Sequence, residues 1–146
     1  MHLGEVERVY IESDRYDGPW AGVADVGGVA HYFQALEGLD MDRRVFQVWP
    51  IVGETLALEQ EQWAIYVRWN DRHEAGEEPL ATHPGHGGVD SRYDELEQLL
   101  EPLRQPPDDT LLLRAETVWL EPKPPRYYLD GVDYGIRWRA AGVLPA

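Results

Sequence analysis

The chain has 146 residues, a formal net charge of −14 and no cysteine, and 43% of its residues are hydrophobic. A length of this order is typical of one domain, so we expect residues 1–146 to form a single globular domain. The absence of cysteine excludes disulfides, thiolate metal sites and cysteine nucleophiles. The negative charge disfavours unaided binding to nucleic acid or to an anionic membrane surface, because both are themselves negatively charged.

Two features of the sequence bear on where the protein works. No apolar run approaches the roughly 20 residues that a membrane-spanning helix requires, and residues 1–10 carry acids where a signal peptide has a basic and then an apolar segment. We therefore expect a soluble cytoplasmic protein. Twelve arginines against a single lysine, Lys123, are typical of a GC-rich bacterial genome.

Short β-strands are expected throughout the first third of the chain. Four segments rich in β-forming residues follow one another at 6–12, 22–26, 29–36 and 44–51. The glycine pair at 27–28, between the second and third segments, is a strong signal for a two-residue hairpin turn. This region therefore predicts a four-strand antiparallel meander.

The periodicity then changes from that of strands to that of a helix. Apolar residues recur at helical spacing at Leu56, Trp63, Tyr66, Val67 and Trp69. Thr55 is a plausible N-cap for this first helix, and Gly76 is a plausible C-terminal stop.

A second helix is expected after a loop rich in proline and glycine at 77–88. Asp90 or Ser91 can cap its N-terminus. Pro102 lacks the amide hydrogen that a helix interior needs, so the helix should kink or end near that residue.

Strand character returns in the last third of the chain. Residues 110–121 and 126–140 are rich in β-formers, the run 122–125 interrupts them, and residues 130–131 form an Asp-Gly turn signal. The order ββββααββ predicts an α+β fold: an antiparallel, strongly curled sheet, made of the N-terminal meander and a C-terminal hairpin, packed by two helices.

His31 is the histidine most easily mistaken for a catalytic residue. Pairing the second and third strands about residues 27–28 places His31 opposite Ala24, on the face that does not carry Asp25. His31 and Asp25 therefore cannot form a dyad in this register. We expect His31 to be a hydrogen-bonded histidine of the core or its rim.

The first turn of the chain holds two acids that are candidates for binding. Asp14 and Asp17 stand close together before Gly18 and Pro19. The alternating ligands of a calcium loop are absent, and Asp, Gly and Pro in this order are typical of a plain turn.

The candidate metal ligands lie around the loop between the helices. They are His83 and His86, three residues apart, with His73 or Asp90 as a third ligand. Imidazole and carboxylate suit zinc, manganese or iron, and Glu74 would then act as the base in a metal-dependent hydrolase. The other interpretation is a plain polar loop, with Asp90 as a helix cap.

Other catalytic and cofactor motifs are missing. Neither of the two serines lies in a G-x-S-x-G sequence, and neither a phosphate-binding loop nor a dinucleotide-binding glycine motif occurs. We therefore expect no cofactor, or a divalent metal if the histidine loop binds one.

Aromatic residues are numerous, and three of them are expected to be exposed. Trp20 follows the first turn, and Tyr127 and Tyr128 follow the proline-rich break at 122–125. Exposed aromatics in an acidic setting are typical of protein-binding surfaces.

Three functional hypotheses follow from these observations. The first is a non-catalytic module that binds a basic protein partner through Trp20, Tyr127 and Tyr128. The second is the metal-dependent hydrolase or metal-binding enzyme. The third is a small-ligand pocket inside the curled sheet, with a lining of four residues: Tyr10, His31, Phe33 and Trp49. The sequence does not determine the oligomeric state.

Overall fold

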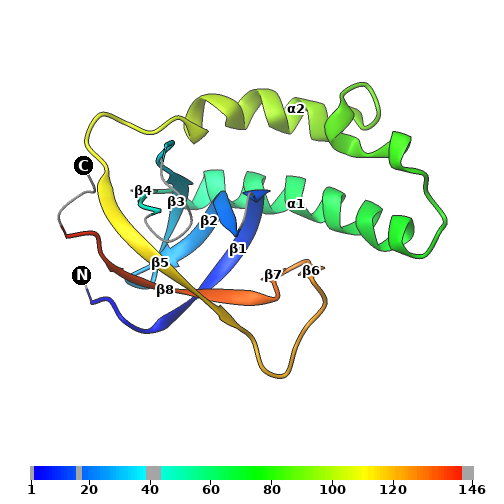
Figure 1. The fold of residues 1–146 in the computed structure, drawn as a ribbon. Helices are drawn as coiled ribbons and strands as arrows, with labels where there is room; N and C mark the ends of the chain where they lie inside the picture. The colour runs from blue at the N-terminus through cyan, green and yellow to red at the C-terminus, as the bar shows by residue number, and fades with distance from the viewer. Residues whose placement is uncertain (1, 16–17, 39–43, 143–146) are drawn as a thin grey trace.

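A closed antiparallel β-barrel forms the body of the structure, a computed structural model that describes residues 2–15, 18–38 and 44–142 (Figure 1). The strands follow one another around the barrel in the order β1-β2-β3-β4-β5-β8. Their bounds are β1 (Val6–Arg15), β2 (Pro19–Val26), β3 (Val29–Ala35), β4 (Phe46–Pro50), β5 (Leu111–Trp119) and β8 (Tyr134–Ala140). The predicted α+β fold is confirmed, and the curl of the sheet is complete.

The predicted register of the β2–β3 hairpin is also confirmed. Ala24 pairs with His31 across the hairpin, and the turn glycines Gly27 and Gly28 have positive φ angles of 60° and 80°. That backbone conformation suits glycine, which has no Cβ to clash. His31 is buried, and its Nδ1 donates to the carbonyl of Val29 at 2.7 Å, as expected of a hydrogen-bonded core histidine.

Strand β8 closes the barrel by pairing on both of its edges. Its long ladder with β5 runs from the pair Leu113↔Ala140 to the pair Trp119↔Tyr134. On its other edge it pairs with β1. The predicted C-terminal hairpin exists as two short strands outside the barrel, β6 (Tyr127–Tyr128) and β7 (Gly131–Val132).

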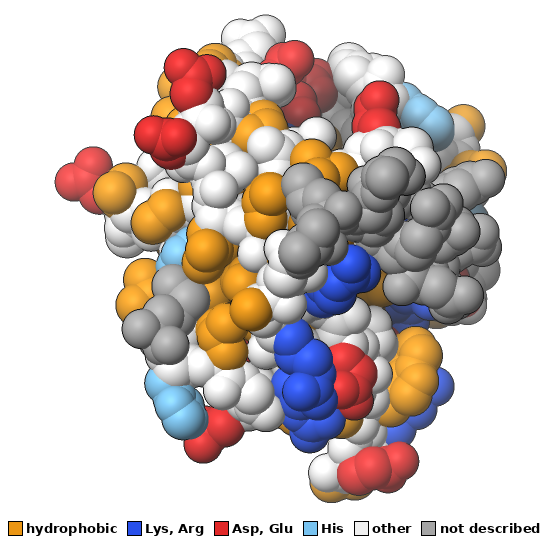
Figure 2. All heavy atoms as spheres, turned by 60° about the vertical axis from the view of Figure 1, so that its left-hand side comes forward, with side chains coloured by type: hydrophobic (Ala, Val, Ile, Leu, Met, Phe, Trp, Pro, Cys, Tyr) orange, Lys and Arg blue, Asp and Glu red, His pale blue; other side chains and the backbone are white. Residues whose placement is uncertain are grey.

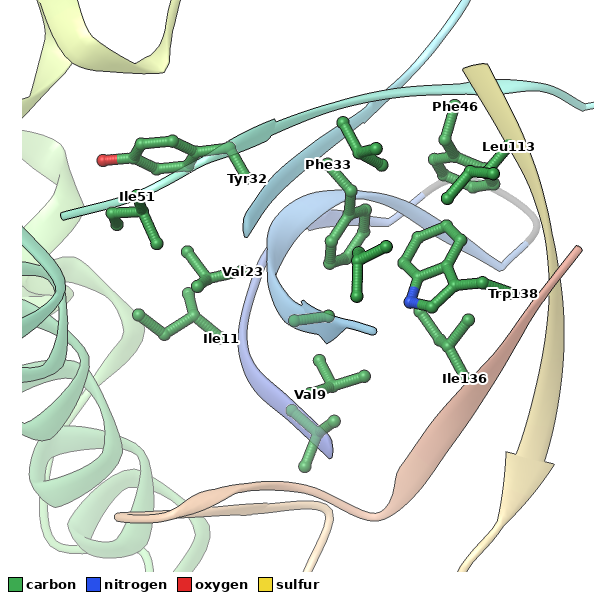
Figure 3. Close-up of a cluster of buried hydrophobic side chains, with 14 of the residues drawn as sticks. Val9, Ile11, Val23, Tyr32, Phe33, Phe46, Ile51, Leu113, Ile136 and Trp138 are labelled. Atoms are coloured by element: carbon green, nitrogen blue, oxygen red, sulfur yellow. The ribbon is translucent and has the colours of Figure 1, made fainter. Parts of the chain in front are cut away.

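Aromatic and branched side chains fill the barrel. The ring centroids of Phe33 and Phe46 lie 5.8 Å apart, and each lies 5.9 Å from that of Trp138. Leu113 and Ile136 are buried beside them (Figure 3). Phe33 packs in this core, and together with Trp49 it also lines a small pocket of about 80 Å³. Tyr10 and His31, the other two residues of the third hypothesis, are not in the lining of that pocket.

Two helices lie side by side along the barrel (Figure 1). Helix α1 (Gly53–Glu74) is the longer, and α2 (Ser91–Leu100) packs on it. Figure 3 shows Tyr32, Ile51 and Ile11 between the strands and the helices. None of the helices in the described part of the chain is long and apolar enough to cross a membrane.

The helix ends agree with the predictions except at one position. Asp90 caps α2 by accepting a hydrogen bond from the Tyr93 amide at 2.8 Å, and Gly76 follows the end of α1 with a φ of 79°. The predicted cap at Thr55 is wrong. Helix α1 begins at Gly53, its N-cap is Val52, and the Leu56 amide donates to the Val52 carbonyl.

Short 3-10 helices make up the remaining helical structure. The loop between α1 and α2 holds η2 (Leu80–Thr82) and η3 (Pro84–His86), and α2 continues into η4 (Glu101–Arg104) at Pro102. The predicted break of the second helix near Pro102 is therefore confirmed.

Charge is unevenly distributed over these elements. Residues 53–104, the helical layer, carry 12 acidic and 4 basic side chains, a net −8, whereas residues 111–142 carry 4 acidic and 5 basic, a net +1. Figure 2 shows the side that lies to the left in Figure 1, where Lys and Arg side chains gather beside hydrophobic ones. The helical layer therefore carries more than half of the net charge of −14.

Candidate functional site

A cleft of about 360 Å³ lies between the barrel and the helical layer. Pockets that hold small ligands commonly measure about 300–1,000 Å³, so this one suits a small group or a side chain. Its lining comes from the end of β1, from α1, from the loop before α2, from α2 and η4, and from β6. The lining residues are Ile11, Glu12, Ser13, Asp14, Arg15, Glu59, Gln62, Trp63, Tyr66, His83, Tyr93, Glu97, Arg104 and Tyr127.

One side of the cleft is built around the buried carboxylate of Glu59 on α1. Arg104 donates to both of its oxygens, from Nε at 2.9 Å and from Nη2 at 2.8 Å. Nη1 of Arg104 donates to Glu97 at 2.9 Å, and Nη2 also donates to Gln62 at 2.6 Å. The hydroxyl of Tyr32 donates to Glu59 from the barrel at 2.6 Å. This network ties η4, α1, α2 and β3 together.

The other side is built around the buried carboxylate of Glu12 on β1. It accepts hydrogen bonds from Nη2 of Arg126 at 2.7 Å and from the hydroxyls of Tyr127 at 3.1 Å and Tyr134 at 2.5 Å. Nη1 of Arg15 lies 3.6 Å from the same carboxylate. Charged hydrogen bonds of this kind are the stronger ones in proteins. They hold the β6–β7 hairpin against β1.

Between the two networks stands a wall of three rings: Trp63, Tyr66 and Tyr127, here called the aromatic wall. Every pair of their ring centroids is 5.5 Å apart. His83 extends the wall at 5.4 Å from Tyr66. Burial lowers the pKa of His83, and the neighbouring His86 and His73 lower it further, so the imidazole is neutral near pH 7.

The hydroxyls that face the two buried carboxylates belong to tyrosines that resist ionisation. Burial raises the pKa of Tyr127 and of Tyr134 well above the usual value of 10, and the negative charge of Glu12 raises both further. Burial and the hydrogen bond to Glu59 raise the pKa of Tyr32 in the same direction. These groups are therefore uncharged hydrogen-bond donors at neutral pH.

This pattern predicts a loss of stability in alkali. Above about pH 10 the unfolded chain releases tyrosine protons that Tyr32, Tyr127 and Tyr134 keep in the folded state, so the free energy of unfolding falls as the pH rises further. The absorbance of phenolate, followed against pH in buffer and in urea, measures how tyrosine ionisation differs between the folded and the unfolded chain. Part of the eight-tyrosine signal should appear only when the fold is lost. Complete titration near the usual pKa with circular dichroism unchanged would contradict the prediction.

The structure places the predicted binding residues in different parts of the molecule. Asp14 and Tyr127 line the cleft, whereas Trp20 and Tyr128 are not among its lining residues. Asp17 lies outside the described residues. The expectation that the three aromatics are exposed is wrong, since all of them are half-buried. Trp20 packs under the guanidinium of Arg44 at 4.9 Å, and Tyr127 packs edge to face with Trp63.

The predicted metal ligands come close together without forming a metal site. Trp69 lies between His73, stacked on it at 4.7 Å, and His83 at 4.6 Å, and His86 lies 5.3 Å beyond His83. No three His, Asp or Glu side chains within residues 2–15, 18–38 and 44–142 are placed to hold one ion.

Local hydrogen bonds fix the orientation of these side chains. His73 donates from Nδ1 to the Glu78 carbonyl at 2.8 Å, and Nδ1 of His83 accepts from the Gly85 amide at 2.8 Å. Asp90 is occupied as the cap of α2. Glu74, the proposed base, is the last residue of α1. The histidine loop is therefore held by its own backbone.

The charged residues that build the cleft were missed by the sequence analysis. Glu12, Arg104 and Arg126 lie far apart in the chain and resemble ordinary surface charges there. Glu59 had a detectable signal, because it falls three residues after Leu56 and four before Trp63, on the apolar stripe of α1. A charge on such a stripe is buried only when it is paired.

The cleft brings several kinds of chemical group together. Two buried carboxylates, their arginine partners, a wall of aromatic rings and a neutral imidazole meet in one place. The chain matches no family model, no curated protein and no solved structure.

Proposed function

We propose that the protein is a non-catalytic binding module that docks a basic protein partner through the cleft. The observation that carries the proposal is the charge of the lining beside the aromatic wall. The lining holds four carboxylates and two arginines, a net −2, and its one histidine is neutral: Glu12, Asp14, Glu59 and Glu97 against Arg15 and Arg104. Carboxylates attract a cationic side chain, and the faces of Trp and Tyr rings stabilise it.

The wider charge distribution supports the same kind of partner. The helical layer that forms one side of the cleft has a net charge of −8 out of −14 for the whole chain. Fields of this size speed the encounter with an oppositely charged protein and set its orientation. We expect a basic partner to approach from the helical side.

The pairing of the buried carboxylates favours binding over catalysis. Glu59 accepts hydrogen bonds from Nε and Nη2 of Arg104. Glu12 accepts hydrogen bonds from Arg126 and from tyrosine hydroxyls. These donors occupy the carboxylate oxygens, whereas a general acid or base must lie within hydrogen-bond reach of a substrate atom. A chain without cysteine also suits the reducing cytoplasm, where we propose that the module works.

Replacing Asp14 with asparagine tests the proposal. Asp14 lines the mouth of the cleft and is exposed, so the variant should fold normally. Short peptides of alternating Arg and Gly, and of alternating Lys and Gly, should both bind the wild-type protein at low salt. Asp14→Asn should lower the affinity for both peptides by about two- to fivefold, which is the effect of one ion pair at the rim of a binding site. Isothermal titration calorimetry measures this.

The matched control is Asp109→Asn, which removes the same charge from an exposed residue outside the cleft. It should leave the affinity nearly unchanged, and a Glu–Gly peptide should not bind. If neither basic peptide binds at low salt, the proposal is wrong. If Asp109→Asn weakens binding as much as Asp14→Asn, the attraction comes from the overall charge and not from the cleft.

A further inference from the structure

We infer that the group the cleft takes from its partner is an arginine side chain, whose guanidinium replaces that of Arg15 beside Glu12. The inference rests on the proposed function and adds to it a choice among cations. Three features of the cleft support it: the shape of the aromatic wall, the guanidiniums already present and the loose contact of Arg15.

The aromatic wall is closed, and this decides which cations it suits. Trp63 and Tyr66 each meet Tyr127 edge to face, with interplanar angles of 88° and 71°, and all three centroid distances are 5.5 Å. Rings at this spacing are in contact with one another. An aromatic cage for a methylated ammonium needs rings that surround the cation. A cation in the cleft must instead lie against the outside of the wall.

A flat cation fits against the outside of this wall, next to carboxylates, better than a compact one does. The guanidinium of Arg126 lies 4.5 Å above the Tyr127 ring while its Nη2 donates to Glu12. Arg104 forms a two-pronged contact with Glu59 on the opposite side of the cleft. A planar fork can stack on a ring and pair with a carboxylate at once, whereas an ammonium acts as a point charge. The cleft therefore offers the surroundings that favour arginine over lysine.

Arg15 is held far more loosely than the other two guanidiniums. Its side chain is 40% exposed, and its Nη1 lies 3.6 Å from Oε2 of Glu12, which is too long for a hydrogen bond. Arg126 and Arg104 hold their carboxylates at 2.7 Å and 2.8 Å. Glu12 itself is buried, and it keeps its hydrogen bonds to Arg126, Tyr127 and Tyr134 when its long contact with the exposed Arg15 is lost. Arg15 can therefore leave Glu12 at low cost and make room for an incoming guanidinium.

The test is the effect of Arg15→Ala on the binding of the two basic peptides. Removing the competing guanidinium should raise the affinity of the Arg–Gly peptide by about two- to fivefold, the size of one exposed ion pair. The wild-type protein should bind the Arg–Gly peptide more tightly than the Lys–Gly peptide. Arg15→Gln, which removes the charge and keeps most of the side-chain length, should repeat the result.

Arg68→Ala is the matched control, since Arg68 is exposed on α1 and does not line the cleft. The same rise in affinity in Arg68→Ala would overturn the inference, because it would report only the change in net charge. Equal affinity for the two peptides, tightest binding of a trimethyl-lysine peptide, or weaker binding in Arg15→Ala would also overturn it. In each of these cases the proposed function stands if Asp14→Asn alone still weakens binding, so the two failures are distinguishable.

Discussion

Arg104→Ala is expected to lower the free energy of unfolding by about 3–5 kcal/mol, the usual cost of removing one partner of a buried ion pair. The side chain of Glu59 is only 3% exposed, and Arg104 supplies two of its hydrogen bonds. Without Arg104 the carboxylate stays buried with its charge uncompensated. Urea unfolding followed by tryptophan fluorescence measures the change.

Two further variants make this result interpretable. Arg92→Ala removes an arginine that pairs at the surface with Glu61 and Glu95, and it should change stability little. Arg104→Met combined with Glu59→Leu should recover much of the loss, because an apolar pair leaves no buried charge. A loss in Arg104→Ala no larger than in Arg92→Ala would mean that Glu59 is solvated and that this network does not support the cleft.

Trp138→Ala is expected to cost about 3–5 kcal/mol, the range for removing a large buried aromatic side chain. Trp138 is fully buried in the barrel, with its ring 5.9 Å from those of Phe33 and Phe46. Its Nε1 donates to the carbonyl of Asp25 at 2.9 Å. The variant therefore leaves a cavity and also removes a hydrogen bond to a backbone group.

The matched control for this variant is Trp119→Ala on β5. Trp119 is 56% exposed and meets Tyr134 at one edge, so its loss should cost less than about 1 kcal/mol. Denaturant unfolding of both variants under the same conditions makes the comparison. Similar losses in both would contradict the packing of Trp138 at the centre of the barrel.

Local signals explain which parts of the fold were predictable. The turn at Gly27 and Gly28 fixes the register of its hairpin, because few other residues adopt positive φ angles there. Asp90 and Pro102 mark the start and the end of a helix by their own backbone chemistry. The closure by β8 has no such signal, since its partners on β1 lie at the opposite end of the chain.

The candidate site was predictable only in part, for a related reason. Asp14 and Tyr127 were proposed as binding residues from turn chemistry and aromatic content, and both line the cleft. Glu12 and Arg126 meet only because the β6–β7 hairpin folds back on β1. Pairing of charges across so many residues depends on the complete fold, and no local pattern predicts it.

The position of β8 also affects how the chain reaches its folded state. β8 pairs with β5 on one side and with β1 on the other, so the barrel cannot close until the segment ending at Ala140 has been synthesised. Until then β1 and β5 have free edges that can pair with other chains. Contacts so distant in sequence slow folding and prolong that exposure. We therefore expect the growing chain to be most prone to aggregate just before β8 leaves the ribosome.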